Sequence, residues 1–173
     1  SGTIQPKRDL CVAHTRMGRI CLQMGDIEAA QSHRQSALRV LEDLERMSPR
    51  GPQVMADRVG VRALSGNVAL ATGQANVAHE EYEKALAAAR SLAGSAGAGL
   101  KEQRDLSACL KFLGDADLAI QNPEGAQARY LQANEIDRHL VDENPTNAAV
   151  KRELAMGLRR LGQASLAMDH LED

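Results

Sequence analysis

Four glycines stand 48 residues apart in this chain of 173 residues, and their regular spacing is the strongest constraint on its fold. The residues that share this period are Gly18, Gly66, Gly114 and Gly162, then Leu22, Leu70, Leu118 and Leu166, then Ala30, Ala78 and Ala126, and also Ala37, Ala85 and Ala133. Matched positions at a fixed period indicate a repeat protein, in which successive units stack on one another. The predicted units span residues 4–50, 51–99, 100–146 and, in part, 147–173.

Each unit has the pattern of two helices joined by a short turn. The first stretch is apolar at helical spacing, at Leu10, Ala13, Met17, Ile20 and Cys21. Asp26 is a suitable N-cap for the next helix, and Asn122 followed by Pro123 is a stronger start signal in the third unit. The helices predicted in this way span residues 4–24, 26–47, 53–73, 75–93, 100–121, 123–143 and 147–169. No alternating pattern predicts a strand, so the predicted class is all-α.

The repeated glycines lie in the middle of predicted helices, where glycine costs about 1 kcal/mol relative to alanine. Four such glycines at one register indicate a packing requirement. We therefore expect Gly18, Gly66 and Gly114 each to contact the helix that follows, which a side chain would push away.

The second and third units resemble the tetratricopeptide repeat family. The resemblance rests on Gly66, Gly73, Ala78, Tyr82 and Ala85, and in the third unit on the residues Gly114, Ala126, Tyr130 and Ala133, with Gln121 replacing the second glycine. The family period is about 34 residues, so longer helices are expected here, as in long-helix bacterial arrays of this type. The resemblance implies a right-handed superhelical solenoid of antiparallel helix pairs with a concave groove.

In such arrays, one face of each first helix lines the groove. The resemblance places five candidate partner-binding residues there: Arg16, Arg19, Asn67, Lys111 and Arg159. Arginine and lysine suit carboxylates, so an acidic or carboxylate-bearing peptide is the expected ligand. The alternative is that these side chains are simply exposed and bind nothing.

The sequence predicts no catalytic, cofactor-binding or metal site. No two of the five histidines are three or four residues apart, and the three cysteines form no Cys-x-x-Cys pair. A ligand set drawn from different helices stays possible, although solvated or packing histidines are the simpler interpretation. The cysteines are expected to be buried thiols in a reducing compartment, which favours a cytoplasmic protein. The net charge of -2 favours neither a nucleic-acid nor a membrane partner.

The predicted function is a non-enzymatic scaffold or adaptor that binds a peptide or a partner helix. The alternatives are a regulatory arm of a larger signalling or effector enzyme and a self-assembly module. Ser1-Gly2 without an initiating Met resembles the remnant of a cleaved tag, so the chain is interpreted as a possible fragment. The last helix carries an apolar series that is expected to be partly exposed and to form a weak homodimer through Leu154, Leu158 and Leu161.

Overall fold

The protein is all-α in the residues that the structure describes, which are residues 4–172 with side chains to residue 168. This computed structural model contains, within that range, α1 (Ile4–Gln23), α2 (Ile27–Met47), α3 (Pro52–Ala71), α4 (Ala75–Ala93), α5 (Leu100–Ala119), α6 (Pro123–Glu143) and α7 (Ala148–Glu172). No strand occurs in this range. The predicted helices are confirmed, with ends that differ by a few residues.

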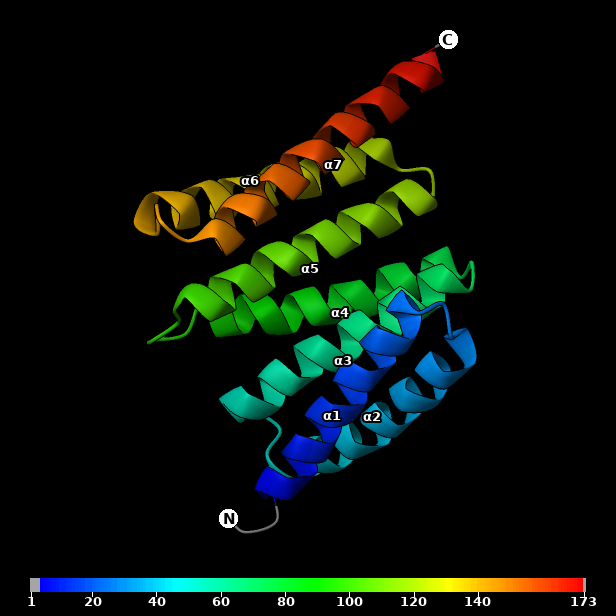
Figure 1. The fold of residues 1–173 in the computed structure, drawn as a ribbon, viewed down its shortest axis with the longest axis vertical. Helices are drawn as coiled ribbons and strands as arrows, with labels where there is room; N and C mark the ends of the chain where they lie inside the picture. Colours follow the sequence, from blue (N-terminus) through cyan, green and yellow to red (C-terminus); the bar gives the residue numbers. More distant parts are fainter. Residues whose placement is uncertain (1–3, 173) are drawn as a thin grey trace. The chain divides into compact units, whose positions relative to one another are not determined.

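The chain divides into two compact units, Ser1–Leu92 and Ala93–Asp173 (Figure 1). In the first unit, α1 packs against α2, and both of them contact α3. In the second unit, α6 contacts both α5 and α7, and α5 also touches α7. Each unit therefore contains a helix pair followed by the first helix of the next pair.

Short polar caps and left-handed residues set the helix ends. The Asp26 carboxylate accepts a hydrogen bond from the Ala29 amide at 2.9 Å. The Asn122 side chain accepts one from the Gly125 amide at 3.1 Å. Both caps confirm the sequence prediction. The turn that closes each complete helix pair contains a residue with positive φ, and in the third repeat this residue is Gln121, at 61°.

Gln121 should be a point where glycine improves the fold. An L residue in the left-handed region costs roughly 1 kcal/mol, and Gly25 and Gly73 occupy the same register in the first two repeats without that cost. We expect Gln121→Gly to raise the free energy of unfolding by about 0.5 kcal/mol, because the added entropy of the unfolded chain offsets part of the gain. Urea denaturation followed by circular dichroism measures it. Gln132→Gly, in the middle of α6, is the control and should lower stability by about 1 kcal/mol.

The repeated glycines lie in the helix contacts, as predicted. A Cβ built on Gly66 would lie 2.3 Å from the Tyr82 ring, and one on Gly114 would lie 2.5 Å from the Tyr130 ring. Gly18 faces His33 of α2 and, more closely, a leucine of α3. All three glycines are buried. The glycine at this register therefore lets the next helix approach closely.

Both tyrosines also bond to the helix on which their rings lie. The Tyr82 hydroxyl donates to Asn67 Oδ1 at 2.7 Å, and the Tyr130 hydroxyl donates to Asp115 Oδ1 at 2.8 Å. Asn67 and Asp115 are 48 residues apart, each one position after its glycine. A glycine followed by an oxygen acceptor therefore receives a tyrosine from the next helix in two successive repeats.

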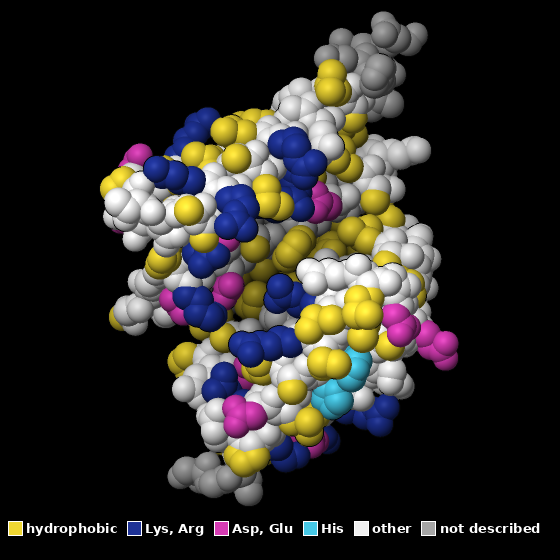
Figure 2. All heavy atoms as spheres, in the orientation of Figure 1, with side chains coloured by type: hydrophobic (Ala, Val, Ile, Leu, Met, Phe, Trp, Pro, Cys, Tyr) yellow, Lys and Arg dark blue, Asp and Glu magenta, His cyan; other side chains and the backbone are white. Residues whose placement is uncertain are grey.

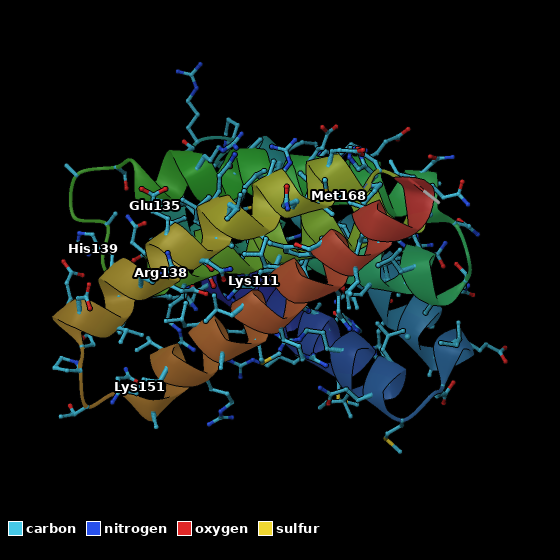
Figure 3. The ribbon with its side chains drawn as sticks, turned by 90° about the horizontal axis from the view of Figure 1, so that it is seen from above. Lys111, Glu135, Arg138, His139, Lys151 and Met168 are labelled. Atoms are coloured by element: carbon cyan, nitrogen blue, oxygen red, sulfur yellow. The ribbon has the colours of Figure 1, made fainter. Side chains whose placement is uncertain are left out.

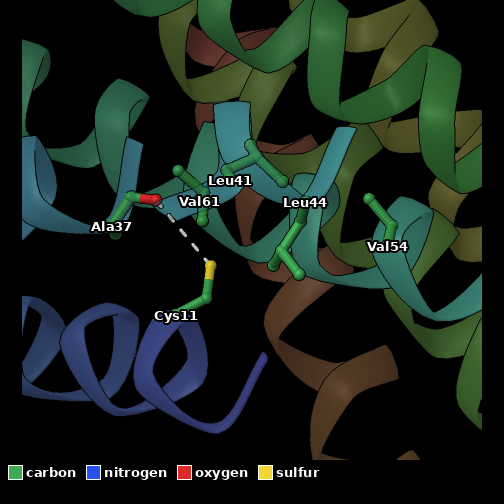
Figure 4. Close-up of a cluster of buried hydrophobic side chains, with 6 residues drawn as sticks. All are labelled: Cys11, Ala37, Leu41, Leu44, Val54 and Val61. Carbon is green, nitrogen blue, oxygen red and sulfur yellow. Dashed lines mark hydrogen bonds between the residues drawn. The ribbon is translucent and has the colours of Figure 1, made fainter. Parts of the chain in front are cut away.

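The best-defined core of the first unit lies between α1, α2 and α3 (Figure 4). Its buried residues are Cys11, Ala37, Leu41, Leu44, Val54 and Val61. Val61 is 0% exposed, so this position of α3 is fully covered. Fully burying an aliphatic side chain of this size stabilises a fold by about 1.5–3 kcal/mol.

Ion pairs between first helices recur at twice the repeat period. In the first unit, Arg8 Nε lies 2.7 Å from Asp57 Oδ2, which joins α1 to α3. In the second unit, Arg104 joins α5 to α7 through Glu153, with a nitrogen-oxygen distance of 2.5 Å. The two pairs are related by 96 residues, so the repeat in the sequence is also a repeat of contacts.

The apolar stripe of α1 faces away from the core. Leu10, Met17 and Ile20 are 48%, 46% and 47% exposed, although their spacing is that of a helix face packed in a core. The buried side of α1 instead consists of Cys11, Thr15 and Gly18. The small size of these residues lets α2 and α3 approach α1 closely.

Candidate interaction surfaces

Helix α7 presents an uncovered face centred on Gly162. No atom that the structure describes lies within 4 Å of a Cβ built on this glycine. Leu158 and Leu166, one turn before and one turn after it, are 42% and 61% exposed. We call Leu158, Gly162, Gln163 and Leu166 the α7 face.

The α7 face has the same register as the surfaces that receive tyrosines in the earlier repeats. Gly162 corresponds to Gly114, and Gln163 corresponds to Asp115. Leu166 corresponds to Leu118, which packs against the buried cluster around Tyr130. On α5 these positions are covered by α6, whereas on α7 no described residue covers them.

Helix α1 has a second open face, formed by Leu10, Ala13, Met17, Ile20 and Met24, which we call the α1 face. Its equivalents on α3 are covered, because Val61 and Val68 pack in clusters with alanines and a leucine of α2. Ala13 has the register of Val61, and Ile20 has that of Val68. The α1 face is therefore the counterpart of a surface that a second helix covers in the next repeat.

Three of the five predicted partner-binding residues are exposed. Arg16 and Arg19 lie on the surface of the first unit, and Arg159 lies on the surface of the second. Figure 2 shows Lys and Arg side chains on the visible face of each unit. Asn67 is half-buried, and its oxygen already accepts the Tyr82 hydroxyl.

Lys111 is buried, which corrects the expectation that it lines an open surface. Its residue is 6% exposed, and its ammonium group donates to Asp137 at 2.5 Å and to the Glu153 carbonyl at 3.1 Å. Figure 3 shows Lys111 among α5, α6 and α7. Lysine at this register thus joins three helices instead of facing a ligand.

The group around Lys111 resembles a catalytic arrangement only in its residue types. Ser107 donates to Asp137 Oδ1 at 2.6 Å, so a hydroxyl, a carboxylate and an ammonium meet. Ser107 and Asp137 are each 1% exposed. A substrate has no route to the serine oxygen in this conformation, and the group holds helices together.

The three leucines predicted as an oligomer face have different environments. Leu158 is exposed, and Leu154 is half-buried. Leu161 packs against the cluster of Ala126, Tyr130 and Ala164, so it belongs to the α6–α7 contact rather than to a free face. Part of the last helix is exposed, as predicted, and dimer formation itself stays a prediction.

Two histidines that are distant in the sequence meet between α1 and α2. The Nδ1 atoms of His14 and His33 are 3.0 Å apart, which is the length of one hydrogen bond between imidazoles. Arg62 and Glu81 form an ion pair at 3.0 Å in the same register of the next repeat. The 48-residue register was the signal that these helix positions meet. Within the described residues, no group of three or more His, Cys, Asp or Glu could hold a metal ion.

The buried cysteines are chemically quiet. Burial raises the pKa of the Cys11 thiol to about 12, and nearby Asp57 acts in the same direction. Burial likewise raises the pKa of Cys109 to about 12. The thiolate is the reactive form, so neither residue is a nucleophile at neutral pH.

A pocket of about 660 Å³ opens in the second unit between the start of α5 and the end of α6. It is lined by residues from Ala98 to Gln103 and from Glu135 to Asn144. Its lining includes His139, whose ring lies 3.5 Å from the Glu143 carboxylate. The lining residues include no serine, threonine, cysteine or lysine, so they supply no hydroxyl, thiol or amine nucleophile.

No protein-family model matches this sequence, and no curated protein matches it. Among the described residues, no helix combines the length and the apolar character that crossing a membrane requires.

Proposed function

We propose that the protein is a non-enzymatic interaction scaffold that binds an amphipathic helix of a partner. The observation that carries this proposal is the open α7 face, whose equivalents on α3 and α5 are covered by helices. The α1 face supports it, because Leu10, Met17 and Ile20 are about half exposed on one side of a helix. Exposed apolar surface at positions made for helix packing favours a helix as the ligand.

The proposal keeps the tetratricopeptide-like interpretation of the sequence, with a cytoplasmic location, because the long helix pairs resemble that family. Arg16 and Arg19 would attract acidic residues of a partner bound to the first unit, and Arg159 would do so on the second. Exposed charges of this kind contribute more to association rate and specificity than to affinity.

The proposal is tested by selecting binders from a displayed library of amphipathic helical peptides. We expect the selected peptides to bind the wild-type chain and to lose at least tenfold in affinity with Met17→Glu or Leu158→Glu, because a carboxylate in an apolar contact is costly. Fluorescence anisotropy measures the affinities. Leu131→Glu is the control, since Leu131 is 53% exposed on α6 and belongs to neither face.

The outcome that contradicts the proposal is a selection that yields no binder, or binders that neither face variant weakens. Binders that only Met17→Glu weakens would assign the function to the α1 face and leave the proposal intact.

A further inference from the structure

We infer that Gly162 and Gln163 form a receiving site for a tyrosine of the partner helix. This inference rests on the proposed function and specifies what the α7 face recognises. In two earlier repeats, a glycine and the acceptor after it hold a tyrosine ring and its hydroxyl. Helix α7 repeats both features at the same register, and its glycine is uncovered.

The local chemistry of α7 fits an incoming tyrosine. Gly162 has no side chain, so an aromatic ring can lie flat on the helix backbone, as the Tyr130 ring does over Gly114. Gln163 is exposed, and its Oε1 can accept the phenol hydrogen, as Asp115 does for Tyr130. Leu158 and Leu166 supply apolar surface on both sides of the ring.

The two internal examples also define the residues around the tyrosine. Each tyrosine has an alanine four residues before it and another three residues after it: Ala78 and Ala85 around Tyr82, and Ala126 and Ala133 around Tyr130. All four alanines are 0% exposed. Small residues at these positions let two helices approach closely. The expected partner is therefore an amphipathic helix with the pattern Ala-x-x-x-Tyr-x-x-Ala.

A second copy of this chain does not readily supply that tyrosine. The chain has two tyrosines, which are 1% and 0% exposed and both donate hydrogen bonds inside their own units. Offering either one to another molecule would require a unit to open. The site therefore fits a helix of a different polypeptide.

The test uses the full chain and a labelled synthetic peptide with the sequence of residues 123–143, which carries the pattern. We expect saturable binding by fluorescence anisotropy, weakened at least tenfold when the peptide's tyrosine is replaced by alanine. Gly162→Leu should weaken binding at least tenfold by filling the ring position, and Gln163→Leu about threefold by removing the acceptor. Met156→Leu should leave binding unchanged, because position 156 lies on a different side of α7.

Two results would overturn the inference. One is equal binding to the wild-type chain and the Gly162→Leu chain, which would mean that the peptide exchanges with α6 or binds elsewhere. The other is no binding at concentrations up to about 200 µM. Either result leaves the proposed function standing if library-selected helices are still weakened by Leu158→Glu or Met17→Glu.

Discussion

Gly114→Ala should destabilise the protein by about 2 kcal/mol, whereas Gly162→Ala should stabilise it by about 0.5–1 kcal/mol. The same substitution is made at the same repeat register in both cases. At Gly114 the new methyl group would lie 2.5 Å from the Tyr130 ring, which is 0% exposed and held by a hydrogen bond to Asp115. Overpacking of this kind typically costs 1–3 kcal/mol. At Gly162 the methyl group meets no described atom, so only the helix propensity of alanine acts.

Urea denaturation of the two variants, followed by circular dichroism, measures both effects. A third chain that combines Gly114→Ala with Tyr130→Leu separates the ring clash from other causes. The added cost of Gly114→Ala should shrink in that background, because the flexible leucine can move aside. Changes of the same sign at Gly114 and Gly162 would contradict the assignment of this register to close helix packing.

The sequence was informative about the helices because helix ends depend on nearby residues. Asp26 and Asn122 cap the helices that they were predicted to cap, since a cap bonds to an amide three residues away. The contacts of Gly66 and Gly114 were also predictable, because the period carried the information that a single glycine lacks. Repetition thus replaced the tertiary information that a single sequence normally does not contain.

The outward-facing surfaces could not be predicted in the same way. Leu10 and Met17 have the spacing of a core face, yet the core side of α1 is made of smaller residues, including Cys11 and Gly18. Which of two faces becomes buried depends on the helices that pack against it, and periodicity does not specify them. Lys111 illustrates the same limit, because its acidic partner, Asp137, is 26 residues away on another helix.

Asp137→Ala should be among the most destabilising single substitutions in the second unit, at roughly 3–5 kcal/mol. The Asp137 carboxylate accepts from Lys111 and from Ser107, and its side chain is fully buried. Without it, the Lys111 ammonium keeps only the Glu153 carbonyl as a described partner. Burying a charge without its counterion is costly, so helices α5, α6 and α7 should separate more easily.

The control is an ion pair of the same length on the surface. Lys7 Nζ lies 2.5 Å from Asp43, but both side chains are 40% exposed. Asp43→Ala should therefore cost less than about 1 kcal/mol, because water replaces the lost partner. Replacing both buried groups together, with Lys111→Met and Asp137→Leu, should cost less than Asp137→Ala alone, since no unpaired charge remains. Urea denaturation gives the free energies of unfolding, and hydrogen exchange shows whether amides of α5 to α7 lose protection. Equal losses for Asp137→Ala and Asp43→Ala would mean that burial does not govern the contribution of the Lys111 pair.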